Sequence, residues 1–101
     1  MQIDHTSLEV HHNTDRKRFE IQVNGHKGVV EYMLAGDRII FTHTEVDVAL
    51  EGQGIAALLA KTGLEYAQAQ QLKVMPLCPY VAGYMKRHPE YQPLLAPGFH
   101  V

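Results

Sequence analysis

The hydrophobic pattern of this chain changes its period once, at the segment ALEGQGIA, residues 49–56. Before this segment, apolar and polar residues alternate, as they do in half-buried strands. After it, apolar residues recur at helical spacing and predict an amphipathic helix over 52–71. Gly63 lies inside that helix, where glycine is unfavourable, which indicates close packing at this point. When the strands come first in the chain and a helix follows them, only a few topologies are possible for the fold.

Three segments before the change of period have the composition and alternation of strands: 18–23, 28–35 and 38–46. Asn24-Gly25 separates the first two and is the strongest short hairpin signal, because both residues tolerate positive φ. Gly36-Asp37 supplies the second turn. We therefore expect an antiparallel meander. The segment SLEVHH, residues 7–12, is a candidate fourth strand at one edge.

The short apolar segment LKVMPL, residues 72–77, follows the predicted helix and is typical of a buried strand. If it lies parallel to 38–46, the helix between them is a right-handed crossover. A second helix is predicted over 78–88, where Pro89 ends it. The expected fold class is α+β: a mixed sheet, made of an antiparallel meander and a parallel βαβ crossover, with two helices and an irregular tail.

Length, charge and cysteine content narrow the class of protein. A chain of 101 residues predicts one domain. Its net charge of −2 lacks the basic excess of nucleic-acid binders, so no nucleic-acid partner is expected. One cysteine cannot form an internal disulfide, which favours a reducing cytosol. The sequence has neither a signal-peptide core nor an apolar stretch of about 18 residues. We predict a cytoplasmic monomer or weak dimer without a membrane partner.

Gly52 and Gly54 open the predicted helix directly after a strand. Such a turn directs backbone N–H groups and the positive end of the helix dipole toward one point, and neither glycine obstructs a phosphate. The turn is a candidate anion site, although such turns equally serve packing alone. It matches neither the P-loop nor the Rossmann fingerprint. Lys86 and Arg87, near a helix C-terminus, either complement the dipole or supply charge to a phosphate.

Cys78 is the only cysteine and directly precedes Pro79, which suits the first turn of a helix. The thiol is therefore expected near a helix N-cap, where the dipole favours the thiolate. An isolated cysteine is also commonly an inert buried side chain. The residues alone leave both interpretations open.

The strand segment FTHTEV, residues 41–46, carries candidate acid–base groups. Alternation predicts that Phe41, His43 and Glu45 share one face of the strand. If Phe41 faces the core, His43 and Glu45 lie on the same side, near the start of the glycine turn, where they suit acid–base chemistry. The other histidines lack the spacing of a metal site, so no metal is predicted.

These segments together resemble the GNAT N-acetyltransferase superfamily, and within it the miniature, yjdJ-type branch. The motifs that carry the resemblance are HTEV, EGQGIA and CPYVAGYMKRHPEY, and it extends from about Phe19 to Tyr91. It implies a minimal GNAT fold, acetyl-coenzyme A as co-substrate and N-acetyl transfer to an amine. The identity of the acceptor amine is not implied.

The resemblance also implies where coenzyme A binds. The pyrophosphate would lie on backbone N–H groups of the glycine turn, in which Gly54 and Ala56 match the family motif. Glu51 stands where the superfamily has Arg or Gln and adds an unfavourable negative charge. Pantetheine would pair with the strand near Thr44 to Val46. The expected cofactor-binding residues are Thr44, Val46, Glu51, Gly52, Gln53, Gly54, Ile55, Ala56, Lys86 and Arg87.

The same branch implies a cysteine and a histidine near the acetyl group, here Cys78 and His43. In one route Cys78 accepts the acetyl group as a thioester, and His43 assists proton transfer. In the other, an amine attacks acetyl-coenzyme A directly, Glu45 or His43 takes its proton, and Tyr84 protonates the leaving thiolate. A coenzyme A-binding module without turnover and a protein-interaction domain with a purely structural glycine turn are the alternatives to an enzyme.

Overall fold

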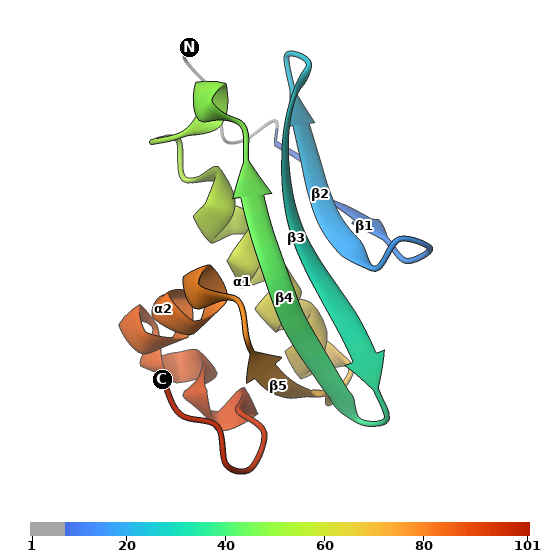
Figure 1. The fold of residues 1–101 in the computed structure, drawn as a ribbon, viewed down its shortest axis with the longest axis vertical. Helices are drawn as coiled ribbons and strands as arrows, with labels where there is room; N and C mark the ends of the chain where they lie inside the picture. The colour runs from blue at the N-terminus through green and yellow to red at the C-terminus, as the bar shows by residue number, and fades with distance from the viewer. Residues whose placement is uncertain (1–7) are drawn as a thin grey trace.

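The structure, a computed structural model, describes residues 8–101, and the strands of this range form one sheet (Figure 1). Their order across the sheet is their order in the chain. The strands are β1 (His11–Asn13), β2 (Arg18–Val23), β3 (His26–Ala35), β4 (Arg38–Val46) and β5 (Lys73–Pro76). The helices are α1 (Ile55–Ala69) and α2 (Pro79–Arg87), with short 3-10 helices η2 (Val48–Leu50) and η3 (Pro89–Leu94).

The sheet is mixed, as the sequence predicts. Strands β1 to β4 pair antiparallel, and β5 pairs parallel to β4 after the α1 crossover. Asn24 and Gly25 both have positive φ, 51° and 81°, so the predicted hairpin turn is confirmed. The candidate edge strand over 7–12 is present but shorter than expected, because β1 covers only His11–Asn13. Ser7 lies outside the described residues.

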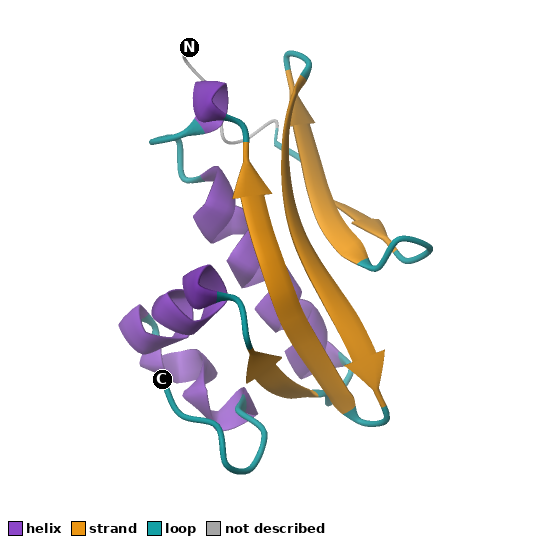
Figure 2. Cartoon of the chain, in the orientation of Figure 1, coloured by secondary structure: helices purple, strands orange, loops and turns teal. Residues whose placement is uncertain are grey.

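One face of the sheet is buried beneath helices. Figure 2 shows α1 running along the back of the sheet, and α2 packs against α1, β4 and β5. Inward-facing strand residues join the apolar faces of both helices in one core, which includes Phe19, Ile21, Val30, Ile39, Phe41, Leu59, Leu64, Val81 and Met85. None of the helices within residues 8–101 has the length and apolarity that a membrane span requires.

The predicted close packing at Gly63 is confirmed. A Cβ atom at this position would lie 2.9 Å from Cε1 of Phe41, which is closer than real Cβ contacts allow. Glycine therefore lets α1 approach β4, at some cost in helix propensity. This contact fixes the helix over the strand that carries FTHTEV.

Both helices begin and end near their predicted limits. The helix predicted over 52–71 begins only at Ile55, because Gly52 and Gly54 have φ of 77° and 76°, outside the right-handed helical region. Helix α2 has Cys78 as its N-cap and ends at Arg87, within one residue of the prediction at each end. The tail docks against β5, where the Ala96 N–H donates to the Val74 carbonyl at 2.9 Å.

A β-bulge in β4 overturns one prediction. Tyr32 pairs with Phe41 and Glu31 pairs with His43, so Thr42 is an extra residue opposite β3. The alternation therefore shifts by one residue after Phe41. The expectation that His43 and Glu45 share the face of Phe41 is wrong, because both side chains are exposed, at 54% and 73%, while Phe41 is buried.

Candidate active site

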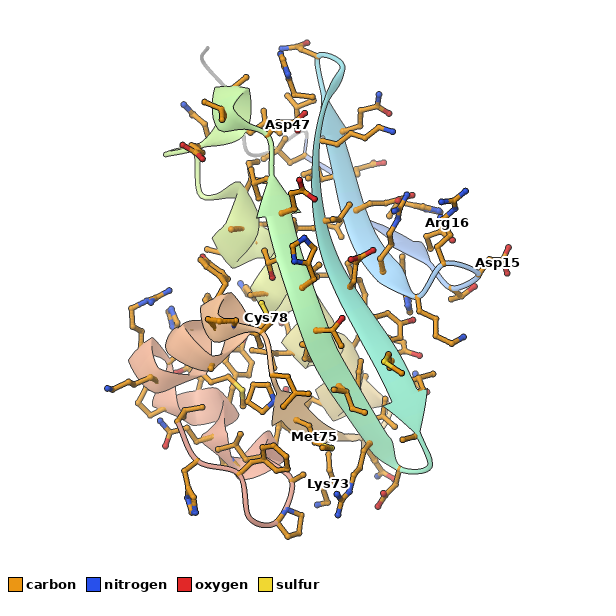
Figure 3. The ribbon with its side chains drawn as sticks, in the orientation of Figure 1. Asp15, Arg16, Asp47, Lys73, Met75 and Cys78 are labelled. Atoms are coloured by element: carbon orange, nitrogen blue, oxygen red, sulfur yellow. The ribbon has the colours of Figure 1, made fainter. Side chains whose placement is uncertain are left out.

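Strands β4 and β5 run together for only part of the length of β4. Their pairing ends at Phe41 and Pro76, whereas β4 continues to Val46. Just beyond this pairing, the Cys78 N–H donates a hydrogen bond to the Phe41 carbonyl at 2.8 Å. We call the divergence between residues 42–46 of β4 and the first turn of α2 the fork. Figure 3 shows Cys78 between the start of α2 and β4.

The glycine turn builds an anion-compatible cradle beside the fork. A Cβ atom on Gly52 would meet no atom within 4 Å, so the backbone there is open to a ligand. The first backbone bond of α1 joins the Leu58 N–H to the Gly54 carbonyl at 3.0 Å. The N–H groups of residues 55–57 precede that bond and lack an acceptor inside the helix. The start of α1 thus has the N–H groups that an anion site requires, and anion binding there stays a prediction.

A pocket of about 250 Å³ joins this turn to the fork. It is lined by Val46, Leu50, Glu51, Gly52, Gly54, Ile55, Ala56, Ala57 and Tyr80. Val46 comes from β4 and Tyr80 from the first turn of α2, so the lining residues span both sides of the fork. Many of the predicted cofactor-binding residues therefore lie around one space. Glu51 also lines it, beside Gly52 of the glycine turn.

The two predicted basic residues differ in position. Arg87 lies over the ring of Tyr80, with Cζ 5.9 Å from the centroid, so its side chain folds back toward the start of α2. A Cβ atom on Gly83 would lie 3.3 Å from Nη1 of Arg87, which agrees with that course. Lys86 is exposed and does not line the pocket. Arg87 is also exposed and outside the pocket lining, but it contacts the ring of Tyr80, which lines the pocket.

Cys78 is buried, with 3% exposure, and its Sγ lies 3.1 Å from Oγ1 of Thr44. Either atom can donate in this hydrogen bond. The contact crosses the fork, because Thr44 belongs to β4 and Cys78 caps α2. The thiol is therefore held at the base of the fork rather than packed only among apolar groups.

His43 and Glu45 lie on the other face of β4. Their Nε2 and Oε2 atoms are 3.4 Å apart in an exposed pair. The contact of Cys78 is with Thr44, the residue between them, which the bulge turns inward. The structure therefore does not bring His43 to Cys78.

Tyr84 lies away from the glycine turn. Its ring stacks on His88 with centroids 4.1 Å apart and lies 6.0 Å from the ring of Tyr91. Burial, and then the neighbouring Tyr91 and Glu90, raise the pKa of Tyr84. The tyrosine that lines the pocket is Tyr80, which sequence reasoning missed. Its position two residues after Cys78, in the same first helical turn, was the available signal.

Within residues 8–101, His, Cys, Asp and Glu side chains form no group of three that could hold a metal ion. What the fold brings together is a thiol and a hydroxyl across the fork, and a glycine turn that lines one pocket with Tyr80.

The fold has a solved counterpart. A solution NMR structure of a Staphylococcus aureus protein described as GCN5-like superposes with a TM-score of 0.72. The match covers 94% of each chain at 24% sequence identity. At that identity the likeness establishes the fold.

Sequence comparisons define the family. Protein NATD1 of Gallus gallus and that of Mus musculus are each 36% identical to this chain over 85 residues, which are 81% of this chain and 77% of the relative. Protein NATD1 of Homo sapiens is also 36% identical over 85 residues, 75% of its length. Residues 18–94 match the family described as GCN5-related N-acetyl-transferase. The chain therefore belongs to the GCN5-related N-acetyltransferase family.

Proposed function

We propose that this protein is an acetyl-coenzyme A-dependent N-acetyltransferase. The observation that carries the proposal is the pocket that joins the glycine turn to Val46 and Tyr80 on the two sides of the fork. An acyl carrier with a pyrophosphate at one end and a thioester at the other matches that layout. Membership of the acetyltransferase family gives independent support.

The residues present fit coenzyme A with one exception. Backbone N–H groups at the start of α1 would bind the pyrophosphate, aided by the positive end of the helix dipole. The part of β4 from Thr44 to Val46, which β5 does not accompany, would pair with the amide groups of pantetheine. Arg87 would offset part of the charge of Glu51, which opposes phosphate binding.

For the acetyl group we propose a route through Cys78. The Cys78 thiolate attacks the thioester carbonyl, a new C–S bond forms, and the bond to the sulfur of coenzyme A breaks. The proton lost by Cys78 balances the one taken up by the departing thiolate. An acceptor amine then attacks the carbonyl carbon of acetyl-Cys78: the C–N bond forms and the C–S bond to Cys78 breaks. The proton that the amine nitrogen loses is balanced by the proton that the departing cysteine sulfur takes up. No electrons are gained or lost in either step.

His43 and Glu45 fit the acceptor side of this scheme. They lie on the exposed face of β4, opposite the face that carries Thr44. They can act only on an amine that reaches the thiol past the edge of β4, because the structure does not bring His43 to Cys78. His43 or Glu45 can then take the proton that the amine loses. In the direct route, which omits the cysteine, Tyr84 would have to protonate coenzyme A; Tyr84, like Cys78, lies outside the residues that line the pocket.

The test is intact-mass analysis after incubation with acetyl-coenzyme A. We expect one acetyl adduct on the wild type and none on Cys78→Ala. Release of free coenzyme A should rise when amines are added, and Cys78→Ala should lose it. An active Cys78→Ala enzyme without an adduct would refute the cysteine route and favour direct attack.

The acidic Glu51 favours one alternative, a coenzyme A-binding module without turnover. Calorimetry separates the two functions. Binding of coenzyme A with neither an adduct nor release across a broad amine panel would establish the module. Absence of binding at millimolar ligand would refute both.

A further inference from the structure

We propose that Thr44 is the residue that positions the Cys78 thiol for acetyl transfer, the place that the family resemblance gives to His43. The inference rests on the proposed function and adds to it a residue and a local structural cause. That cause is the β-bulge at Thr42, which turns Thr44 inward and His43 outward.

The bulge selects which side chains of β4 enter the fork. Without the extra residue, regular alternation from Phe41 would place His43 inside and Thr44 outside. With it, Thr44 is half-buried and reaches Cys78, while His43 is 54% exposed. A bulge beside an active site commonly re-aims a side chain in this way.

Two hydrogen bonds from β4 hold Cys78 at both its backbone and its side chain. The Phe41 carbonyl accepts from the Cys78 N–H at 2.8 Å and fixes the main chain. Thr44 Oγ1 lies 3.1 Å from Sγ. The cysteine side chain has one heavy-atom torsion, so this second bond defines where the sulfur points. Thr44 is β-branched, so its χ1 torsion is restricted, which limits the positions that its hydroxyl can take.

The hydroxyl suits a thiol that changes its charge during transfer. It can accept from the S–H group before ionisation and donate to the thiolate afterwards. Hydrogen bonds to a charged sulfur are the stronger kind. Thr44 neither takes nor releases a proton in the proposed steps, so it acts through Cys78 and is a positioning residue.

The chain offers a matched set of variants. Thr44→Val keeps the shape and removes the hydroxyl, and Thr44→Ser keeps the hydroxyl. Thr42→Val makes the same change at the exposed bulge residue, whose hydroxyl faces the Glu31 carbonyl at 3.4 Å. His43→Ala tests the competing residue. Circular dichroism and thermal melting confirm that each variant is folded.

Two rates are measured on each variant: acetylation of Cys78 by acetyl-coenzyme A, and alkylation of this sole cysteine by iodoacetamide. Loss of a hydrogen bond to a charged group predicts that Thr44→Val slows both about tenfold. Thr44→Ser and Thr42→Val should stay within about twofold of wild type in both. Affinity for coenzyme A, measured by calorimetry, should change little in Thr44→Val.

The outcomes separate this inference from the proposed function. If wild type forms no acetyl adduct, the cysteine route fails, and the alkylation rates alone decide the role of Thr44. Equal alkylation of Thr44→Val and wild type overturns the inference. So does a loss in Thr44→Ser as large as that in Thr44→Val, which would point to shape rather than the hydroxyl. A tenfold loss in His43→Ala would return the role to His43.

Discussion

The imidazole Nε2 of His12 is hydrogen-bonded to the hydroxyl of Tyr32 on the helix-covered side of the sheet. The same imidazole stacks on Phe19 at 4.1 Å and meets the ring of Tyr66 edge-on at 4.5 Å. A histidine on the short edge strand β1 is thereby tied to β2, β3 and α1. The cluster of His12, Phe19, Tyr32 and Tyr66 closes the core at the edge farthest from the fork.

This cluster predicts that stability falls in mildly acidic solution. Burial, and then the charge of His11, lower the pKa of His12 from 6.5. The unfolded chain therefore takes up a proton at His12 near pH 6.5, while the folded protein resists it. The contribution of His12 is present above that pH and is lost as the pH falls toward the lower folded pKa.

Urea unfolding of wild type and His12→Gln at pH 7.5, 6.5 and 5.5 checks this prediction. Glutamine can still bond Tyr32 but does not titrate, so the loss of unfolding free energy between pH 7.5 and 5.5 should be smaller in the variant. Carboxylates titrate mainly below this window and interfere little. An identical loss in both proteins would show that His12 does not contribute.

Gly63→Ala should destabilise the protein although alanine is the better helix former. The added methyl group would lie 2.9 Å from Phe41, a buried ring that cannot move without disturbing the core. Overpacking of this kind costs about 1–3 kcal/mol, against about 1 kcal/mol gained in helix propensity. We expect a net loss of about 1 kcal/mol by urea unfolding.

Gly83→Ala is the matched control for that variant. Its new methyl group would lie 3.3 Å from the tip of Arg87, a flexible side chain that can shift. The same substitution should therefore stabilise the protein by about 0.5–1 kcal/mol. Equal effects of the two alanines, in either direction, would contradict the packing argument.

The order of the strands and the crossover could be predicted because their signals are local. Asn24-Gly25 requires positive φ, and α1 follows its apolar period from Ile55 onward. The bulge at Thr42 could not be predicted in the same way. FTHTEV holds neither glycine nor proline, and the extra residue appears only in the pairing with Glu31 and Tyr32 of β3.

Which tyrosine of α2 lines the pocket also depends on contacts between segments that are distant in the sequence. Val81, Tyr84 and Met85 form the buried stripe at helical spacing, so Tyr84 could have been assigned to the core from sequence. Which residue beside that buried stripe faces the glycine turn depends on the direction that the chain takes from the end of β5 into α2. The Cys78 backbone bond to Phe41 sets that exit and brings Tyr80 to the pocket.

Glu51→Gln should strengthen coenzyme A binding. The carboxylate of Glu51 lines the pocket beside the glycine turn, where a pyrophosphate would add further negative charge. An exposed like-charge contact is worth at most about 1 kcal/mol, so we expect a gain in affinity of about twofold to fivefold, declining with salt. Calorimetry at low and at physiological ionic strength measures it.

Glu65→Gln removes the same charge from an exposed site on α1 outside the pocket lining. Its affinity for coenzyme A should match that of wild type. A gain as large as that of Glu51→Gln would mean that net charge, rather than the location of Glu51, controls binding.

Arg87→Gln should weaken coenzyme A binding more than Lys86→Gln does. Both residues are exposed at the end of α2, but the Arg87 guanidinium folds back over Tyr80, and Tyr80 lines the pocket. A charge at that position acts on bound phosphate within one Debye length, about 8 Å at physiological salt. We expect a loss of about twofold to fivefold for Arg87→Gln and less than twofold for Lys86→Gln. Double-variant calorimetry with Tyr80→Phe, which keeps the ring beneath the guanidinium, should leave the Arg87 effect unchanged. If Lys86→Gln proves the more damaging change, the phosphates lie along a different side of α2.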